Sequence, residues 1–218
     1  MAQIFSRQAN LLTRLVLASL VLGLPLAFFI GGAYYRSGWR TGQDVIRAQP
    51  VPFSHRHHVG QLGIDCRYCH TSVETSAFAG LPSTDICMSC HSQLWTNAEM
   101  LAPVRQSMAG DKPIRWRRVH DLPDFVYFDH SIHVQKGVGC ESCHGRIDQM
   151  PLTRQAESLL MHWCLDCHRQ PERHLRPQEA IFTMGWTPPA DQLAQGRRLA
   201  EAHRLDRNVM VNCSTCHR

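Results

Sequence analysis

The stretch FSHRHHVGQLGIDCRYCH, residues 53–70, holds four histidines and two cysteines in eighteen positions. It ends in the pattern C-x-x-C-H, and four more copies of that pattern follow along the 218-residue chain. All ten cysteines belong to these five copies, so no cysteine is left over. The five motifs are Cys66, Cys69 and His70; Cys87, Cys90 and His91; Cys140, Cys143 and His144; Cys164, Cys167 and His168; and Cys213, Cys216 and His217.

The motif C-x-x-C-H is the attachment signature of c-type haem. Two thiols add across the two vinyl groups of one haem, and the adjacent histidine binds the iron. Zinc sites and thioredoxin-like redox sites share the C-x-x-C part, but neither needs a histidine directly after it. A disulfide within such a pair would close almost no loop and would stabilise little. The sequence therefore predicts five haem c groups, with the five motif histidines as proximal iron ligands.

The formal net charge of the chain is +5. Such an excess alone could indicate an anionic partner such as nucleic acid or an acidic lipid surface. Each haem also carries two propionates, so five haems would more than cancel the excess. We interpret the arginines as propionate partners and solvated surface, and we expect no binding to nucleic acid.

An uncharged apolar run, LVLASLVLGLPLAFFIGGAY, begins at residue 15. Its twenty residues would span about 30 Å as a helix, which matches one hydrocarbon core. A cleaved signal peptide is the alternative, but its apolar part usually spans about 7–15 residues. We predict an uncleaved transmembrane anchor over 15–35, between a cytoplasmic N-terminus at 1–14 and a tether at 36–50. Because haem attachment takes place outside the cytoplasmic membrane, we expect a single-pass protein of the bacterial inner membrane with its haem domain on the periplasmic or outer face.

Residues 51–218 offer roughly 34 residues per haem, too few to bury each haem in its own shell. We therefore predict a mostly α-helical and irregular fold with little sheet, packed around stacked haems. Because a cofactor of this kind couples to folding, the chain without haem should be largely unstructured. One longer helix is predicted within 187–205, with Thr187 as its N-cap and Pro188 in its first turn.

An internal repeat relates residues 53–70 to residues 128–144. Both copies read F-x-H-x-x-H-V, then a short stretch containing glycine, then C-x-x-C-H; the second copy is one residue shorter. A further C-x-x-C-H follows each copy, its first cysteine 21 residues on in one and 24 in the other. The chain is thus predicted to hold two dihaem modules, about 51–91 and 120–168, and a fifth haem at the C-terminus.

The repeat also supplies candidates for the distal iron ligands. A haem with both axial positions filled by protein suits electron transfer, whereas an open position can bind a substrate. His55 and His58 lie three apart, on one helical face, as do His130 and His133. We predict these four as distal ligands, with one of each pair on its own module's haem and the other reaching a neighbour.

One iron then remains without a distal ligand. His120 is the first candidate, and Met161 and Met150 are alternatives. A methionine ligand would raise the potential of its haem relative to that of a haem with two histidines, although core packing is the more usual role of a methionine. The other histidines are expected to be supporting or surface residues: His57, His162, His174 and His203.

The segment RVHDLPDFVYFDHSIHVQKGVGCESCHG, residues 118–145, together with WCLDCHR and the terminal NCSTCHR, is similar to the pentahaem membrane-anchored cytochrome c of bacterial alternative complex III. The F-x-H-x-x-H…C-x-x-C-H arrangement also resembles small class III cytochromes. The first resemblance implies a quinol-oxidising complex with integral-membrane quinol-binding subunits, a large iron–sulfur subunit, and a monohaem cytochrome c or a terminal oxidase. It also implies that His120, His130 and His133 lie at haems.

The leading interpretation is an electron-transfer subunit without a catalytic site of its own. The haems of such a protein carry the chemistry, and the chain sets their potentials and spacing. Two other functions stay open: a membrane-anchored quinol dehydrogenase that works alone, and a multihaem reductase of nitrite or a similar oxyanion. The reductase would need an iron with an open axial position.

Overall fold

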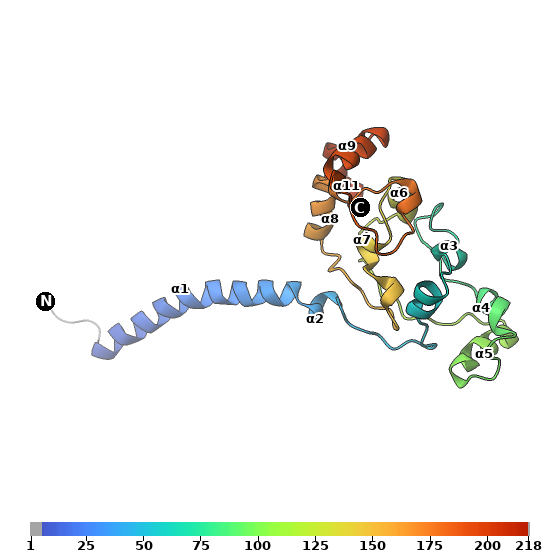
Figure 1. Cartoon of the computed structure of the whole chain (residues 1–218). Helices are drawn as coiled ribbons and strands as arrows, with labels where there is room; N and C mark the ends of the chain where they lie inside the picture. Colours follow the sequence, from blue (N-terminus) through green and yellow to red (C-terminus); the bar gives the residue numbers. More distant parts are fainter. Residues whose placement is uncertain (1–5, 218) are drawn as a thin grey trace. The chain divides into compact units, whose positions relative to one another are not determined.

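A computed structural model describes residues 6–217, and its contacts divide the chain into two units, Met1–Gln43 and Asp44–Arg218 (Figure 1). The first unit consists of α1 (Arg7–Arg36) and the short α2 (Gly38–Thr41). α1 begins before the predicted 15–35 segment and runs through Pro25 without a break. By length and composition it is able to cross a membrane, and none of its apolar stretch is buried among the described residues. A proline is tolerated in a transmembrane helix because neighbouring groups satisfy the freed carbonyl.

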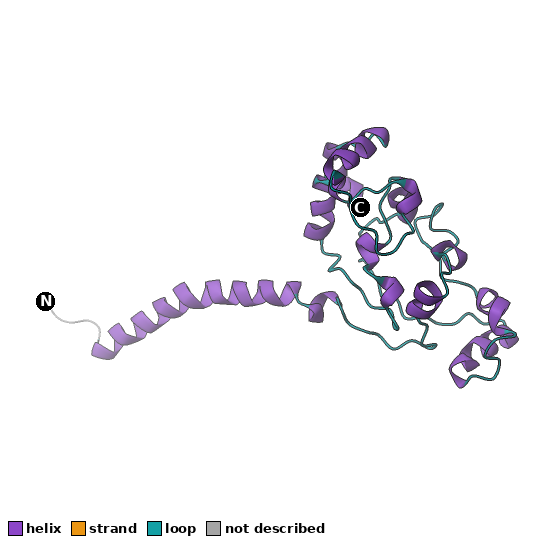
Figure 2. Ribbon diagram, viewed as in Figure 1, coloured by secondary structure: helices purple, strands orange, loops and turns teal. Residues whose placement is uncertain are grey.

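The second unit is made of short helices joined by long loops, and no strand appears in the described part of the chain (Figure 2). Its β-type pairings include the single bridges Ile46 to Arg154, Val126 to His217, and Val138 to Leu175. The mostly helical and irregular fold with little sheet is therefore confirmed. Its helices are η1 (Arg56–Gln61), α3 (Cys66–Cys69), α4 (Thr84–His91), η2 (Glu99–Leu101), α5 (Ala102–Gly110), α6 (His130–Gln135), α7 (Glu141–His144), η3 (Ile147–Gln149), α8 (Met161–Arg169), η4 (Pro171–Arg173), η5 (Gln178–Ala180), α9 (Gln192–Ala202), α10 (Arg207–Met210) and α11 (Cys213–Cys216).

The apolar core of the second unit includes two small clusters. One joins Val51, Leu101 and Val104, and Cys87 and Met88 of α4 lie at its edge. The other joins Val73, Val134 and Ile181. Three buried side chains per cluster make a small core for a unit of this length. A protein with so small a core needs additional stabilisation, for example from bound metals or covalent cross-links.

The two copies of the repeat form helices of different pitch. The second copy forms the α-helix α6, whereas η1 of the first copy is a π-helix. A π turn closes over one residue more than an α turn. The first copy is also one residue longer between its valine and its motif. The wider turn therefore absorbs the extra residue, and both copies present their histidines on a helix.

The helix predicted within 187–205 exists as α9, but it begins later than expected. Asp191 stands at its N-cap, so the prediction of Thr187 at that position is wrong. Thr187 and Pro188 each precede a proline, and the residue before a proline is biased away from helical dihedrals. α9 then packs against η4, with Gly196 set against the backbone of Glu172.

Candidate haem-binding sites

Each C-x-x-C-H motif lies on a short helical turn. At the first and fifth motifs the residue before the first cysteine caps that turn: the side chain of Asp65 accepts a hydrogen bond from the Arg67 amide at 2.8 Å, and Asn212 does the same for Ser214 at 3.1 Å. All ten cysteines are free thiols, exposed or half-buried. Within residues 6–217 no three His, Cys, Asp or Glu side chains are grouped to hold a bare metal ion.

Four of the five proximal histidines are held by a hydrogen bond from Nδ1 to a backbone carbonyl. The bonds run from His70 to Gly80 (2.7 Å), from His91 to Leu94 (3.1 Å), from His168 to Met210 (2.8 Å) and from His217 to Phe125 (3.4 Å). A proton held on Nδ1 leaves the lone pair of Nε2 free, which is how metal-binding histidines are usually oriented. His144 differs, since its buried Nδ1 has no partner.

The second histidine of each repeat is oriented in the same way. His58 and His133 donate Nδ1–H to the carbonyl four residues earlier, at 2.9 and 2.7 Å. A phenylalanine ring stacks on each of them: Phe53 at 4.4 Å and Phe128 at 4.7 Å between ring centres. The same two rings meet the first histidine of each repeat edge-on. The recurring Phe-x-His-x-x-His spacing therefore produces one side-chain arrangement twice.

The first histidine of each repeat is held by the other module. His55 Nδ1 lies 3.0 Å from the hydroxyl of Thr153, and His130 Nδ1 donates to the carbonyl of Ala77 at 2.9 Å. Both partners are distant in sequence, so no local pattern identifies them. The phenylalanines, by contrast, could have been identified, because they recur two residues before each pair.

Three pairs of histidine rings have a separation that suits an iron between them. Two metal–imidazole bonds of about 2.0 Å each, in line and extended to the ring centres, separate those centres by about 6 Å. The pairs are His58 and His91 (6.2 Å), His133 and His168 (6.1 Å), and His130 and His144 (6.4 Å). In each pair one member is a predicted distal ligand and the other is a motif histidine.

His120 lies beside the third motif. Its ring centre is 4.4 Å from that of His144, too close for an iron between them, and its Nε2 is buried without a partner. Burial, followed by neighbouring histidines, lowers the pKa of His144 to about 3 and that of both His120 and His55 to about 4. These imidazoles are therefore neutral near pH 7, which is the form that binds a metal.

The two candidate methionines occupy different environments. Met150 is 2 % exposed and packs inside the loop that follows the third motif. Met161 is 63 % exposed in the first turn of α8, one turn before Cys164. Only Met161 thus presents a sulfur that is not already enclosed by the chain.

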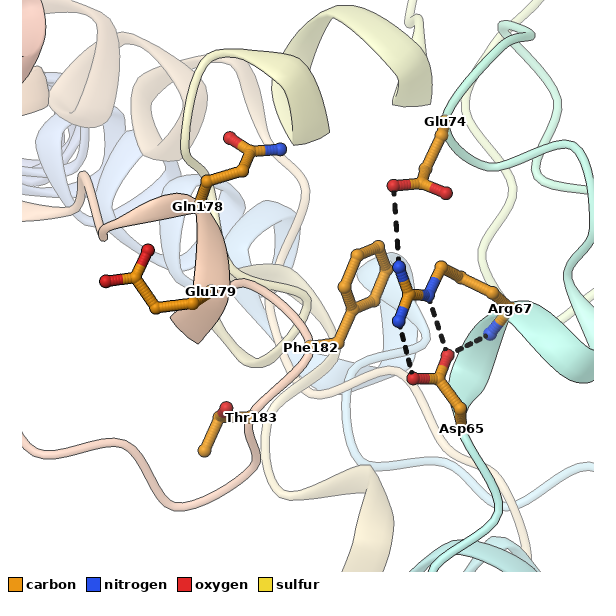
Figure 3. A pocket seen from close by; sticks show the side chains of 7 residues that line it. All are labelled: Asp65, Arg67, Glu74, Gln178, Glu179, Phe182 and Thr183. Atoms are coloured by element: carbon orange, nitrogen blue, oxygen red, sulfur yellow. Dashed lines mark hydrogen bonds and ion pairs between the residues drawn. The ribbon is translucent and has the colours of Figure 1, made fainter.

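A polar hollow lies beside the first motif (Figure 3). The Arg67 guanidinium forms ion pairs with Asp65 at 2.9 Å and Glu74 at 3.8 Å and covers the ring of Phe182 at 4.4 Å. Arg67, which follows the first cysteine of the first motif, therefore pairs with carboxylates of the chain itself.

Comparison with known proteins relates the chain to cytochromes c. Residues 132–218, which hold three of the five motifs, match the cytochrome c3 family, whose members carry c-type haems. The chain is also 36% identical, over 111 residues, to a protein of Nitratidesulfovibrio vulgaris named "Menaquinone reductase, multiheme cytochrome c subunit". That match covers 49% of this chain and 52% of the relative, so the chain spans about half the length of the curated protein it matches. Residues 132–218 are thus similar to cytochrome c3, and the chain is similar to a multihaem cytochrome subunit.

Proposed function

We propose that this chain is a membrane-anchored electron-transfer cytochrome with five covalently bound haem c groups, one at each C-x-x-C-H motif. The observation that carries the proposal is the set of histidine pairs with ring centres 6.1–6.4 Å apart. In each pair a motif histidine and a repeat histidine would form the two sides of a low-spin haem site. In two of the three pairs the Nδ1 of the motif histidine, His91 or His168, is held by a backbone carbonyl.

The pairs suggest an assignment of axial ligands. His58 would be the distal ligand of the second haem, and His133, its equivalent in the second repeat, would be that of the fourth. His130 would then serve the third haem. By the symmetry of the repeat, His55 would serve the first haem, whose proximal histidine is among its neighbours.

The fifth iron takes its distal ligand from the remaining candidates. Met161 is the best placed, because it lies on α8, whose Cys164 is a neighbour of Cys216 in the fifth motif. His120 lies instead against the third site. With Met161 as ligand, the fifth haem would have the highest potential of the five.

In this proposal each bound haem supplies an iron that takes up and gives off one electron at a time. The chain's own groups set the conditions. Nδ1 hydrogen bonds hold the ligand imidazoles in one orientation. Burial lowers the pKa of His58 and His133 and so favours their neutral form, and a phenylalanine ring stacks on each. Removing water and fixing the ligands reduces the reorganisation that accompanies a change of charge on the iron.

The proposed location is the bacterial inner membrane. α1 supports a single-pass anchor, with residues 15–35 in the bilayer, 1–14 in the cytoplasm and 36–50 as a tether. Residues 51–218 would form the periplasmic haem domain, with dihaem modules at about 51–91 and 120–168 and the fifth haem at the C-terminus.

The proposed partners are those of alternative complex III: integral-membrane quinol-binding subunits, a large iron–sulfur subunit, and a monohaem cytochrome c or a terminal oxidase. Quinol oxidation in a membrane subunit would release two protons and two electrons, and this chain would carry the electrons singly to a periplasmic acceptor. The name of the relative favours a second candidate, a cytochrome subunit that delivers electrons to menaquinone. In the two functions electrons would pass through the same haems in opposite directions.

The native membrane complex tests the proposal. Mixed anaerobically with a menaquinol or ubiquinol analogue, the purified oxidised complex should show reduction of all five haems within turnover time. Delivery of electrons from reduced haems to quinone, without reduction by quinol, would favour the second candidate. Haems that react with neither, in a complex that reduces nitrite, would contradict both.

A further inference from the structure

The five motifs contact one another in an order that differs from their order along the chain. On the basis of the proposed function, we infer that the five haem sites form one unbranched row in the order second, first, third, fourth, fifth, numbered by sequence. The second and fifth sites are then the two ends of the row, and the contacts between motifs identify each neighbouring pair in turn.

The second site joins the first through residues inside the two motifs themselves. The hydroxyl of Tyr68, between Cys66 and Cys69, lies 2.8 Å from the hydroxyl of Ser89, which precedes the second cysteine of the second motif. The thiol of Cys87 is also a neighbour of Cys69: burial first, and then that thiol, raises the pKa of Cys69. The first and second haems are therefore attached side by side.

The first site joins the third across the two repeats. The thiols of Cys66 and Cys140 are close neighbours, although 74 positions separate them in the sequence. Around them the backbone of the two modules is closely packed. The amide of Arg56 donates to the carbonyl of Met150 at 2.9 Å, and a side chain at Gly60 would collide with the carbonyl of Asp148.

The third site joins the fourth through its second cysteine. Cys143 has both Cys167 and Cys164 as neighbours, and burial followed by these thiols raises its pKa to about 12. An antiparallel bridge between Val138 and Leu175 fastens the segment before the third motif to the segment after the fourth.

The fourth site joins the fifth through α8. His168, the proximal histidine of the fourth motif, donates Nδ1–H to the carbonyl of Met210, three residues before the fifth motif. Cys164 and Cys216 are neighbouring thiols. The fifth motif is held on its other side by the bridge from His217 to Val126.

The two ends of the row lie at opposite ends of the second unit. Figure 1 shows α4 and α5, which carry and cover the second motif, at one end, α8 and α11 at the other, and α3, α6 and α7 between them. The second motif packs into its own cluster with Val51, Leu101 and Val104. Electrons would therefore enter and leave at the second and fifth haems, and a partner that docks near the first motif would face an interior haem.

The iron positions in the purified holoprotein test this order directly. Anomalous diffraction at the iron edge, or a cryo-EM map of the native complex, gives five irons that can be assigned to their motifs through the thioether bonds. We expect the second-site iron to have a single near neighbour, the first-site iron, and the fourth-site iron to have two, the third and the fifth. A second-site iron nearest to the third or fourth, or a fifth iron not adjacent to the fourth, would overturn the order. A protein without five haems would instead refute the proposed function.

A matched pair of variants tests the order in solution. His58→Met and His133→Met change the same position of the two repeats, at an end site and at an interior site. Besides the altered haem, His58→Met should shift the haem-methyl NMR signals of one other haem, and His133→Met those of two. If the two variants shifted the NMR signals of equal numbers of other haems, the proposed order of sites would be wrong. If either variant fails to fold, the iron positions decide the order.

Discussion

The hydrogen bond between Thr153 and His55 offers a sharp test of how the chain tunes a haem. Thr153→Val keeps the shape of the side chain and removes the oxygen that lies 3.0 Å from His55 Nδ1. In the proposed ligation His55 donates its Nδ1–H to the Thr153 hydroxyl oxygen. This hydrogen bond makes the imidazole a stronger electron-pair donor to the iron through Nε2. Because a stronger donor stabilises the ferric state more than the ferrous state, its loss should raise the reduction potential of one haem.

The size of the shift follows from the contact. A single, part-buried, neutral hydrogen bond contributes about 0.5–1.5 kcal/mol. If the ferrous state gains nothing from it, the one-electron potential rises by roughly 20–65 mV, at 59 mV per factor of ten. Thr75→Val is a suitable control, since the Thr75 hydroxyl contacts only the carbonyl of Ser72, at 3.5 Å, on an exposed turn.

Spectroelectrochemical titration of the holoprotein measures this shift. We expect one of five redox components to move upward in Thr153→Val, with the low-spin spectrum retained, and none to move in Thr75→Val. An unchanged titration, or a downward shift, would show that His55 does not bind iron through Nε2 with Thr153 as its acceptor.

Three further predictions concern stability. Glu141→Gln should cost about 3 kcal/mol, because it leaves the Arg176 guanidinium, 7 % exposed and 3.4 Å away, buried without its charge partner; thermal melting followed by Soret circular dichroism measures it. Gly196→Ala should cost about 1–3 kcal/mol despite the better helix propensity of alanine, since its methyl would fall on the backbone carbonyl of Glu172; chemical denaturation measures it. The chain made without haem attachment should give the far-ultraviolet circular dichroism of a largely disordered polypeptide and no cooperative melt.

Each of the two substitutions has a control variant in the same chain. Asp191→Asn removes an ion pair whose side chains are 64 % and 67 % exposed, so it should cost less than about 0.5 kcal/mol. If Glu141→Gln lost no more free energy of unfolding than Asp191→Asn, burial would not strengthen the ion pair between Glu141 and Arg176. Gly110→Ala, where the added methyl meets nothing, should be tolerated far better than Gly196→Ala. A cooperative melt of the haem-free chain would show that its protein core suffices for folding.

The sequence alone predicted those features that depend on short spacings. The five motifs, the Phe-x-His-x-x-His repeat and the apolar run that forms α1 are all local patterns. A fold with little sheet could also be predicted, because so few residues serve each haem. The start of α9 was predicted wrongly at Thr187, because two successive prolines bias the residues before them away from helical dihedrals.

The remaining features of the site arise from contacts between distant segments. Nothing near Thr153 marks it as the partner of His55, and nothing near Cys66 indicates that its thiol meets Cys140. The position of His120 against His144 likewise joins residues 24 positions apart in the sequence. The π-helical turn of η1 is an intermediate case, since the extra residue was visible but its place in the helix was not.

The central claim is that this fold is organised around five covalently bound haems, and the intact mass of the protein isolated from its native membrane tests it most directly. We predict a mass equal to the polypeptide plus five haem groups, with no thiol available to an alkylating reagent even after unfolding. A native protein with fewer haem additions and reactive thiols at any motif would contradict the account.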